Sequence, residues 1–352
     1  MDNNTIRVAI THGDTNGVGY ELIFRTFEAQ EMLELCTPIV YGSPKVAAFH
    51  RNALQSQTAY TIINEAKEAK DGRLNLLATF PEEVKVVLGT PTEESDAAAQ
   101  KALAKAREDF QQKAFDVLVT APTAKNTTKA PLPMLVNDRL RIALATTGLP
   151  LKDVPQAITQ ELIEEKALLL HRALRRDFRI SKPRIAILAL NPQAGEEETK
   201  AIKPAIETLQ EKKVNIFGPY AADTFFGEAQ YDSFDAVLAL YDGQAIAPFK
   251  ALDFGDGVYY AGGQDIVEAA PLTDAGFSTA GKNEADESSL RHAIYLVTDI
   301  YRNRINYDEP LQNPLKKLYH EKKDDSEKVR FNIPKPKEQK EPKKEGAGEA
   351  NH

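Results

Sequence analysis

From Ile6 to about Asn303, short apolar runs alternate with longer, helix-like segments. The runs show little polar alternation, which is typical of strands buried on both faces of a parallel sheet. This alternation predicts an α/β fold built on a largely parallel sheet. The predicted strands are Ile6–Ile10, Pro38–Tyr41, Val84–Leu88, Val117–Thr120, Arg141–Thr146, Arg184–Leu190 and Ala236–Tyr241; the predicted helices are Gly19–Ala29, Ser95–Ala114, Gln160–Phe178, Lys200–Lys212 and Glu287–Asn303.

The C-terminal part of the chain has a different composition. From Asp308 onward, Lys, Glu, Asp and Pro dominate, and few apolar residues remain. Such a segment cannot bury enough apolar surface to offset its ordering entropy. We therefore predict an α/β domain over residues 1–307 and a disordered, charged tail over residues 308–352. Docking of a charged partner to this tail is an alternative, and a solvated tail is favoured.

The overall composition excludes several classes of protein. The 352 residues include 42% hydrophobic and 27% charged residues, as in soluble globular proteins. No apolar run is long enough to span a membrane, and the N-terminus lacks the features of a secretory signal. The net charge of −8 disfavours nucleic acid as a partner, and a single cysteine, Cys36, fits a reducing compartment. We expect a cytoplasmic protein.

Turns that directly follow predicted strands are the candidate ligand-binding segments, because ligands of open α/β sheets bind at the carboxyl ends of strands. The turn Thr11–Gly19 contains three glycines and precedes a helix, but its spacing is not the dinucleotide-binding fingerprint. In the turn Thr120–Lys125, Lys125 lies where an anion could be held. Taken singly, each turn is explained as well or better as a connecting loop. Two similar turns are Leu190–Gly195 and Leu240–Lys250, and a further segment, Phe217–Phe226, has a carboxylate and a hydroxyl amid apolar neighbours.

Together, these turns resemble the 4-hydroxythreonine-4-phosphate dehydrogenase (PdxA) family of vitamin B6 biosynthesis. The resemblance covers the chain from Arg7 to about Asn303. It implies an isocitrate-dehydrogenase-like fold in two lobes with a cleft between them, and a homodimer that shares its sites. It also implies NAD(P)-dependent, metal-assisted oxidation of a phosphorylated amino acid, followed by decarboxylation. The matching blocks are ITHGDTNGVGYE, VLVTAPTAK, NDRLRIALATTGLPL, KPRIAILALNPQAG, FGPYAADTFF, AVLALYDGQAIAPFKAL and AGKNEADESSLRHAIYL.

The chain departs from this family at the metal site. The family's pattern has three ligand histidines, where this chain has Gly148, Gln193 and Asp242. Glycine offers no side chain and an amide oxygen is a weak ligand, so a divalent metal bound in the family's manner is not expected. Of the remaining histidines, His12 is nearest, but one imidazole does not make a site.

The substrate contacts implied by the resemblance are also altered. The segment Asn126–Val136 lacks a family motif whose His and Thr hold substrate. Tyr259 replaces a substrate-binding asparagine, and Glu268 replaces an arginine, which reverses the charge. Lys250 is the substrate-binding residue that remains, and Asp223 is also retained.

The cofactor contacts implied by the resemblance come partly from the segment Thr273–Gly281. Within it Ala280 and Gly281 match the family, so they are the candidate contacts for NAD or NADP. The residues themselves do not establish whether the cofactor still binds.

Three hypotheses follow. The first is a member of the family that has lost most or all of its catalysis and pairs with itself or with an active relative. The second is an NAD-dependent dehydrogenase of altered substrate or metal-independent chemistry, with Lys250, Lys125 and Asp223 as catalytic candidates. The third is a phosphate- or nucleotide-binding protein that uses the turn Gly13–Gly19 as an anion nest.

Overall fold

The computed structural model describes residues 5–80, 84–124, 130–253 and 255–312, and a sheet of twelve strands is its framework. The strands lie in the order β3-β4-β2-β1-β5-β12-β11-β6-β7-β10-β8-β9. They are β1 (Arg7–Thr11), β2 (Thr37–Gly42), β3 (Tyr60–Ile63), β4 (Leu74–Ala78), β5 (Val117–Thr120), β6 (Leu132–Val136), β7 (Arg141–Leu144), β8 (Ile185–Leu188), β9 (Ile216–Tyr220), β10 (Ala236–Ala239), β11 (Val258–Gly262) and β12 (Val267–Pro271).

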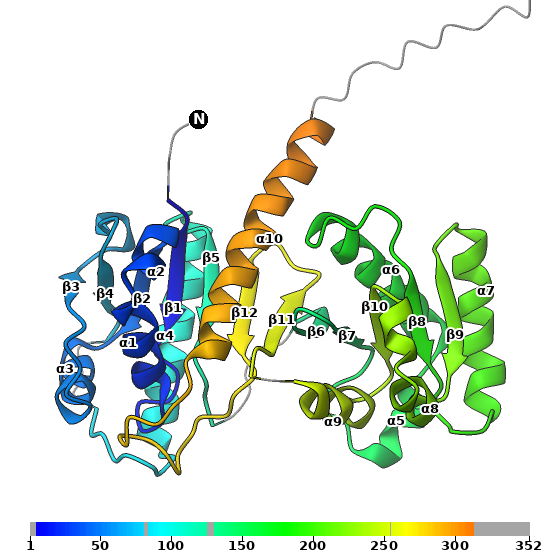
Figure 1. Cartoon of the computed structure of the whole chain (residues 1–352), viewed down its shortest axis with the longest axis horizontal. Helices are drawn as coiled ribbons and strands as arrows, with labels where there is room; N and C mark the ends of the chain where they lie inside the picture. Colours follow the sequence, from blue (N-terminus) through cyan, green and yellow to red (C-terminus); the bar gives the residue numbers. More distant parts are fainter. Residues whose placement is uncertain (1–4, 81–83, 125–129, 254, 313–352) are drawn as a thin grey trace, which may run out of the picture. The chain divides into compact units, whose positions relative to one another are not determined.

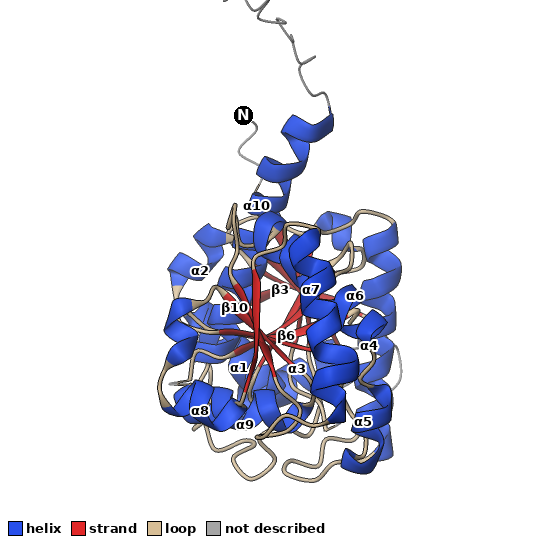
Figure 2. Ribbon diagram, turned by 90° about the vertical axis from the view of Figure 1, so that its right-hand side faces the viewer, coloured by secondary structure: helices blue, strands red, loops and turns tan. Residues whose placement is uncertain are grey.

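Helices cover both faces of this sheet (Figure 2). They are α1 (Gly19–Glu28), α2 (Gln30–Leu35), α3 (Pro44–Ala53), α4 (Glu93–Gln111), α5 (Val154–Ala157), α6 (Gln160–Arg176), α7 (Lys203–Glu211), α8 (Ala222–Gly227), α9 (Asp242–Leu252) and α10 (Ser288–Gln312). None of the helices in the described part of the chain is long and apolar enough to cross a membrane.

The sheet divides the domain into two lobes (Figure 1). Strands β3, β4, β2, β1 and β5 form the N-terminal lobe, and β7, β10, β8 and β9 form the C-terminal lobe. Between them, β11 pairs antiparallel with both β12 and β6, and β6 pairs antiparallel with β7. The other strand pairs are parallel, with Val8 of β1 opposite Val117 of β5, for example. The predicted α/β class, the mostly parallel sheet and the two lobes are therefore confirmed.

The hydrophobic core differs between the two faces of the sheet, because side chains alternate along each strand. On one face a single cluster extends through both lobes and includes Val8 and Ile185. On the other face the core is split into a cluster of the N-terminal lobe, which includes Ala9, and one of the C-terminal lobe, which includes Ala186. The gap between the two smaller clusters lies over the central strands.

Several expected elements differ from the structure. Val84–Leu88 is not a strand: Val87 donates its N–H to the side chain of Asn16 at 2.8 Å instead of to a neighbouring strand. The strands β3, β4, β6, β9, β11 and β12 were not predicted. Helix α10 continues to Gln312, so residues 308–312, which the prediction placed in the tail, are helical. Residues 313–352 of the predicted tail lie outside the described residues.

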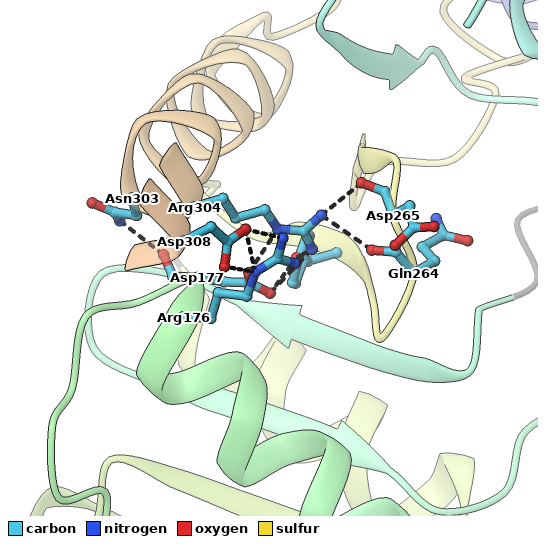
Figure 3. Close-up of polar contacts among 8 residues, drawn as sticks. Arg176, Asp177, Gln264, Asp265, Asn303, Arg304 and Asp308 are labelled. Carbon is cyan, nitrogen blue, oxygen red and sulfur yellow. Dashed lines mark hydrogen bonds and ion pairs between the residues drawn. The ribbon is translucent and has the colours of Figure 1, made fainter. Parts of the chain in front are cut away.

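A buried polar network anchors α10 to the C-terminal lobe (Figure 3). Arg304 of α10 donates from Nε to Asp177, which follows α6, at 2.7 Å, and the hydroxyl of Tyr260 in β11 donates to the same carboxylate at 2.7 Å. Arg304 also donates to the backbone carbonyl of Asp265 at 2.7 Å. The network therefore joins α10 and the β11–β12 hairpin to the C-terminal lobe.

Candidate functional site

The candidate site is the cleft between the lobes, on the face where the core is split. Its volume is about 320 Å³. Helix α4 supplies Gln100 and Leu103 from the N-terminal lobe, and α9 supplies Ile246 and Lys250 from the C-terminal lobe. The strand ends and turns of β1, β5, β11 and β12 complete the lining, with Thr11, Gly13, Thr120, Ala121, Pro122, Thr123, Tyr259, Thr273 and Asp274 among them.

The cleft contains few charged side chains. Lys250 is exposed and lines the cleft, which is where a lysine could hold an anion. Tyr259 is half-buried, and burial, followed by the negative charges of Glu268 and Asp242, raises its pKa to about 12. Tyr259 therefore stays protonated near neutral pH and can offer a hydrogen-bond donor to a ligand.

Glu268, at the position of the family's arginine, is 1% exposed and does not line the cleft. Burial raises the pKa of this carboxyl, while the charge of Arg107, 3.8 Å away, and a hydrogen bond from Gln264 oppose the shift. A buried carboxyl here cannot replace an arginine that pairs with an anion. The charge reversal predicted from the sequence thus removes the cation without providing a new group at the cleft wall.

The opening turn, Thr11–Gly19, uses its polar groups within the protein. The carboxylate of Asp14 accepts from the N–H of Asn16 at 2.8 Å and from Ser95 Oγ at 3.1 Å, and burial raises the pKa of Asp14. The N–H groups of Asp14, Gly17 and Val18 also bond to backbone carbonyls. Four backbone N–H groups of the proposed anion nest, those of Asp14, Asn16, Gly17 and Val18, therefore already donate to acceptors within the protein.

Close packing explains why residue 13 is a glycine. Gly13 has φ +73°, and a Cβ there would lie 2.3 Å from the carbonyl oxygen of Pro122. The first and second strand-end turns thus touch through their backbones, and this contact fixes the N-terminal wall of the cleft.

The structure brings together two of the three positions that correspond to the family's metal ligands. The N–H of Gly148 donates to the carboxylate of Asp242, at the start of α9, at 2.7 Å. Gly148 provides no ligand atom, and Asp242 is partly occupied by this bond. Gln193 is exposed. Of these three positions, Asp242 supplies a carboxylate and Gln193 an exposed amide.

The turn that carries Gln193 is held in shape by Glu198, which begins a π-helical segment (Glu198–Ile202). Its carboxylate accepts from the N–H of Asn191 at 2.8 Å and of Gly195 at 2.6 Å. Burial alone would raise the pKa of Glu198, but these hydrogen bonds outweigh it and lower the pKa. The turn is well defined although its ligand residue is gone.

The other candidates from the sequence lie in different places. Asp223 is exposed in the first turn of α8 and does not line the cleft, so the structure does not bring it together with Lys250 there. Lys125 lies outside the described residues. Ala280 and Gly281 follow Thr273 and Asp274 of the cleft lining, and a Cβ at Gly281 would lie 2.5 Å from a side-chain carbon of Leu88.

His12 is also explained by the structure. It is fully buried in the N-terminal lobe and stacks on Tyr20, with 5.3 Å between ring centroids. Burial, followed by the charge of His50, lowers its pKa to about 4, so the ring is neutral at pH 7. His12 is a core residue and not a ligand at the cleft.

Sequence reasoning missed the contribution of α4 to the site. Gln100 and Leu103 lie on one helix face, and no strand-end turn marks them. Their helical spacing is a weak signal, because most such pairs pack in a core.

Comparison with known sequences identifies the family. The family described as "Pyridoxal phosphate biosynthetic protein PdxA" matches residues 34–131 and 126–297. The chain belongs to the PdxA family. It is 44% identical over 358 residues to a 4-hydroxythreonine-4-phosphate dehydrogenase of Bacteroides thetaiotaomicron, which covers 94% of this chain and 98% of that protein. A Geobacter metallireducens protein of the same description is 32% identical over 335 residues, covering 86% of this chain and 97% of that protein.

A solved structure supports the assignment. The crystal structure of a 4-hydroxythreonine-4-phosphate dehydrogenase from Burkholderia phymatum superposes with a TM-score of 0.66 at 26% identity, covering 85% of this chain and 98% of that one. The described lobes and cleft are therefore those of a PdxA-family protein, and the sequence resemblance is confirmed.

Proposed function

We propose that the cleft binds a small phosphorylated ligand, and that the metal-assisted dehydrogenation of the PdxA family is lost or strongly reduced in this chain. The observation that carries the proposal is the state of Gly148, Gln193 and Asp242. One of these residues has no side chain, one is an exposed amide, and one carboxylate bonds to a backbone N–H. Removing a single electrostatic contact to a transition state typically costs about 10²–10³ in rate.

Lys250 is the residue that we propose for holding the ligand's anionic group. It projects from α9 into the cleft, and Thr120 and Thr123 of the β5 turn line the same space. Lysine acts as a point charge toward phosphate, and hydroxyls add donors that do not need a fixed fork geometry. The carboxylates of Asp242 and Asp14 accept hydrogen bonds from Gly148 and Ser95, and no hydrogen bond from Lys250 to either carboxylate is found among the described residues.

NAD or NADP is the cofactor that we propose for the same cleft. Its support is membership of the family, together with the position of Thr273 and Asp274 on the cleft wall just before the Ala280–Gly281 turn. We further propose a homodimer, or a heterodimer with an active relative, on the basis of the family.

Retained catalysis is the second candidate function. The observation in its favour is the 44% identity to the Bacteroides thetaiotaomicron dehydrogenase over almost the whole of that protein. On this view the chain oxidises the same or a related substrate with altered metal dependence, and Lys250 and Tyr259 of the cleft hold or polarise it.

The deciding experiment measures NADH formation from 4-hydroxythreonine-4-phosphate with Mg²⁺, Mn²⁺ or Zn²⁺, beside a relative that has all three histidines. The first proposal expects turnover more than a thousandfold below the relative with every metal. Turnover within about a hundredfold, less than the loss of one strong electrostatic contact can cost, would establish the second candidate instead. Calorimetry with NAD, NADP and phosphate esters then tests binding separately from turnover.

A further inference from the structure

A group of side chains that could bind a metal ion lies on the opposite face of the sheet from the cleft. Asp138, Asp256 and His292 each offer one ligand atom, and these atoms all lie within 4.8 Å of one another. They line a groove of about 490 Å³ next to α10. Val258 lines this groove whereas its neighbour Tyr259 lines the cleft, so the two sites are separated by the thickness of the sheet.

The fold brings these three residues together from distant parts of the chain. Val136 ends β6 and pairs with Val258, which begins β11, in an antiparallel register. Asp138 lies two residues beyond the end of β6, and Asp256 lies two residues before the start of β11. Because the strands run in opposite directions, both aspartates lie at the same end of the β6–β11 pair.

His292 comes from the second turn of α10, and its ring is oriented by the backbone. Its Nδ1 lies 2.8 Å from the carbonyl oxygen of Ser288. A carbonyl only accepts hydrogen bonds, so Nδ1 is the donor, and in the neutral imidazole Nε2 is the nitrogen that offers a lone pair. Metal-bound histidines typically have their second nitrogen bonded to a backbone carbonyl or carboxylate in this way. This orientation is independent of the two carboxylates.

The charges around the three residues also favour a cation. The carboxylate of Asp253 lies next to that of Asp256 and adds to the negative charge there. Asp253 Oδ1 is buried and has no hydrogen-bond partner among the described residues. Arg141 is the cation that lines the groove, and its guanidinium lies over the ring of Phe178 at 5.0 Å. Its single positive charge does not balance the carboxylates.

We propose that Asp138, Asp256 and His292 bind one divalent cation. One imidazole and two carboxylates suit Zn²⁺ and Mn²⁺, and the nitrogen ligand disfavours Mg²⁺ and Ca²⁺, which prefer oxygen alone. Among first-row ions, Zn²⁺ binds more tightly than Mn²⁺ at a given site of this kind. Three protein ligands leave a coordination position open toward the groove. This site is separate from Gly148, Gln193 and Asp242 and does not depend on the function proposed above.

The test is calorimetric titration of the full chain with Zn²⁺, Mn²⁺ and Mg²⁺. We expect one Zn²⁺ per chain, weaker binding of Mn²⁺, and no measurable binding of Mg²⁺ at the same concentrations. His292→Gln and Asp256→Asn should each weaken Zn²⁺ binding about a hundredfold or more, beyond the 10–100-fold typical of residues that only support a ligand. Asp242→Asn, which changes the carboxylate at the family's metal position, is the matched control and should leave Zn²⁺ binding unchanged.

Cobalt provides a second readout that does not depend on activity. Co²⁺ bound by the wild type should give visible absorption bands that change or disappear in His292→Gln, while thermal unfolding without metal shows that the variant is folded. The proposal is overturned if wild type binds no Zn²⁺, or if His292→Gln and Asp256→Asn bind it as tightly as wild type. Loss of binding in Asp242→Asn alone would place the ion at the cleft and would equally overturn it.

Discussion

Removing Asp177 should destabilise the domain more strongly than removing any exposed charge. Asp177 is 2% exposed and Arg304 is 6% exposed, and they are joined by bonds of 2.7 Å and 3.3 Å. In Asp177→Ala the guanidinium of Arg304 stays charged, because arginine does not deprotonate in proteins. It keeps its bonds to the carbonyls of Gln264 and Asp265, at 3.1 Å and 2.7 Å, but loses its counter-charge.

The expected cost is about 3–5 kcal/mol of unfolding free energy, the range for breaking a buried ion pair by removing one partner. Three hydrogen bonds to the carboxylate are lost, two from Arg304 and one from Tyr260. A hydrogen bond to a charged group is worth about 1.5–3 kcal/mol, so the two short ones alone account for that range. Removing both charges in Asp177→Ala/Arg304→Met should cost less than the sum of the single changes, because no unpaired charge stays buried.

The assay is urea unfolding followed by far-UV circular dichroism. Glu196→Ala is the control, since Glu196 and Lys200 form an ion pair whose side chains are 80% and 72% exposed, and it should leave the midpoint unchanged. The reasoning is refuted if Asp177→Ala shifts the midpoint no more than Glu196→Ala does. Strict additivity of Asp177→Ala and Arg304→Met would show that the two residues do not act as a pair.

Three further outcomes are expected. Lys250→Ala should weaken binding of phosphate esters by about 10–100-fold, the worth of one hydrogen bond to a charged group, and calorimetry giving an unchanged affinity would remove Lys250 from the site. The pKa of His12 falls from 6.5 to about 4 on folding, so the unfolded chain binds the proton first and stability decreases as the pH falls from 6.5 toward 4. His12→Phe keeps an aromatic ring and should remove part of this pH dependence in urea midpoints measured at pH 7 and pH 4.5; an identical dependence in the variant would assign it to other groups. Restoring histidine at Gly148, Gln193 and Asp242 together should create Zn²⁺ binding at the cleft. A side chain at position 148 costs some strain, because Gly148 has φ +67°. An unchanged number of Zn²⁺ ions bound per chain would show that these three positions do not come together.

The sequence predicted the parallel strands inside each lobe, whereas the strands at the two sheet edges, β3, β4 and β9, and the central strands β12, β11 and β6 were not predicted. In the predicted strands Val117–Thr120 and Arg184–Leu190, the residues 117–119 and 185–190 are all apolar, which is typical of strands buried on both faces, and the structure has β5 and β8 there. Val84–Leu88 is apolar except for Lys85, but the strand predicted there was wrong, because the side chain of Asn16 accepts the hydrogen bond of the Val87 N–H. The absence of a strand here depends on the side chain of Asn16, which lies on another loop, and no pattern within Val84–Leu88 indicates that contact.

Helix α9 was predicted as a turn for a similar reason. Gly243 and Pro248 disfavour a helix in isolation, but both lie in Asp242–Leu252, where Phe249 is fully buried. Tertiary packing overrides local propensity here. Lys250 was nevertheless placed in the cleft from the sequence, because the family resemblance fixed its position relative to the strand ends.

The grouping of Asp138 with Asp256 and His292 could not be read from the sequence. It depends on the register of β6 against β11, two strands far apart in the chain. Neither strand was predicted, and no residue spacing in the sequence resembles a metal-ligand motif at these positions.

The position of β12 has a consequence for how the protein is made. Strand β5 is bordered by β1 on one side and by β12 on the other, and β12 is far later in the chain. At about 5–20 residues per second, synthesis of the chain from Thr120 to Val267 takes on the order of ten seconds. During this interval the nascent N-terminal lobe exposes one edge of β5, where unpaired backbone N–H and C=O groups lie between mostly apolar side chains, the kind of surface on which chains aggregate. A chaperone that covers strand edges on the ribosome should therefore raise the soluble yield of this protein more than that of an α/β domain whose strands pair in chain order.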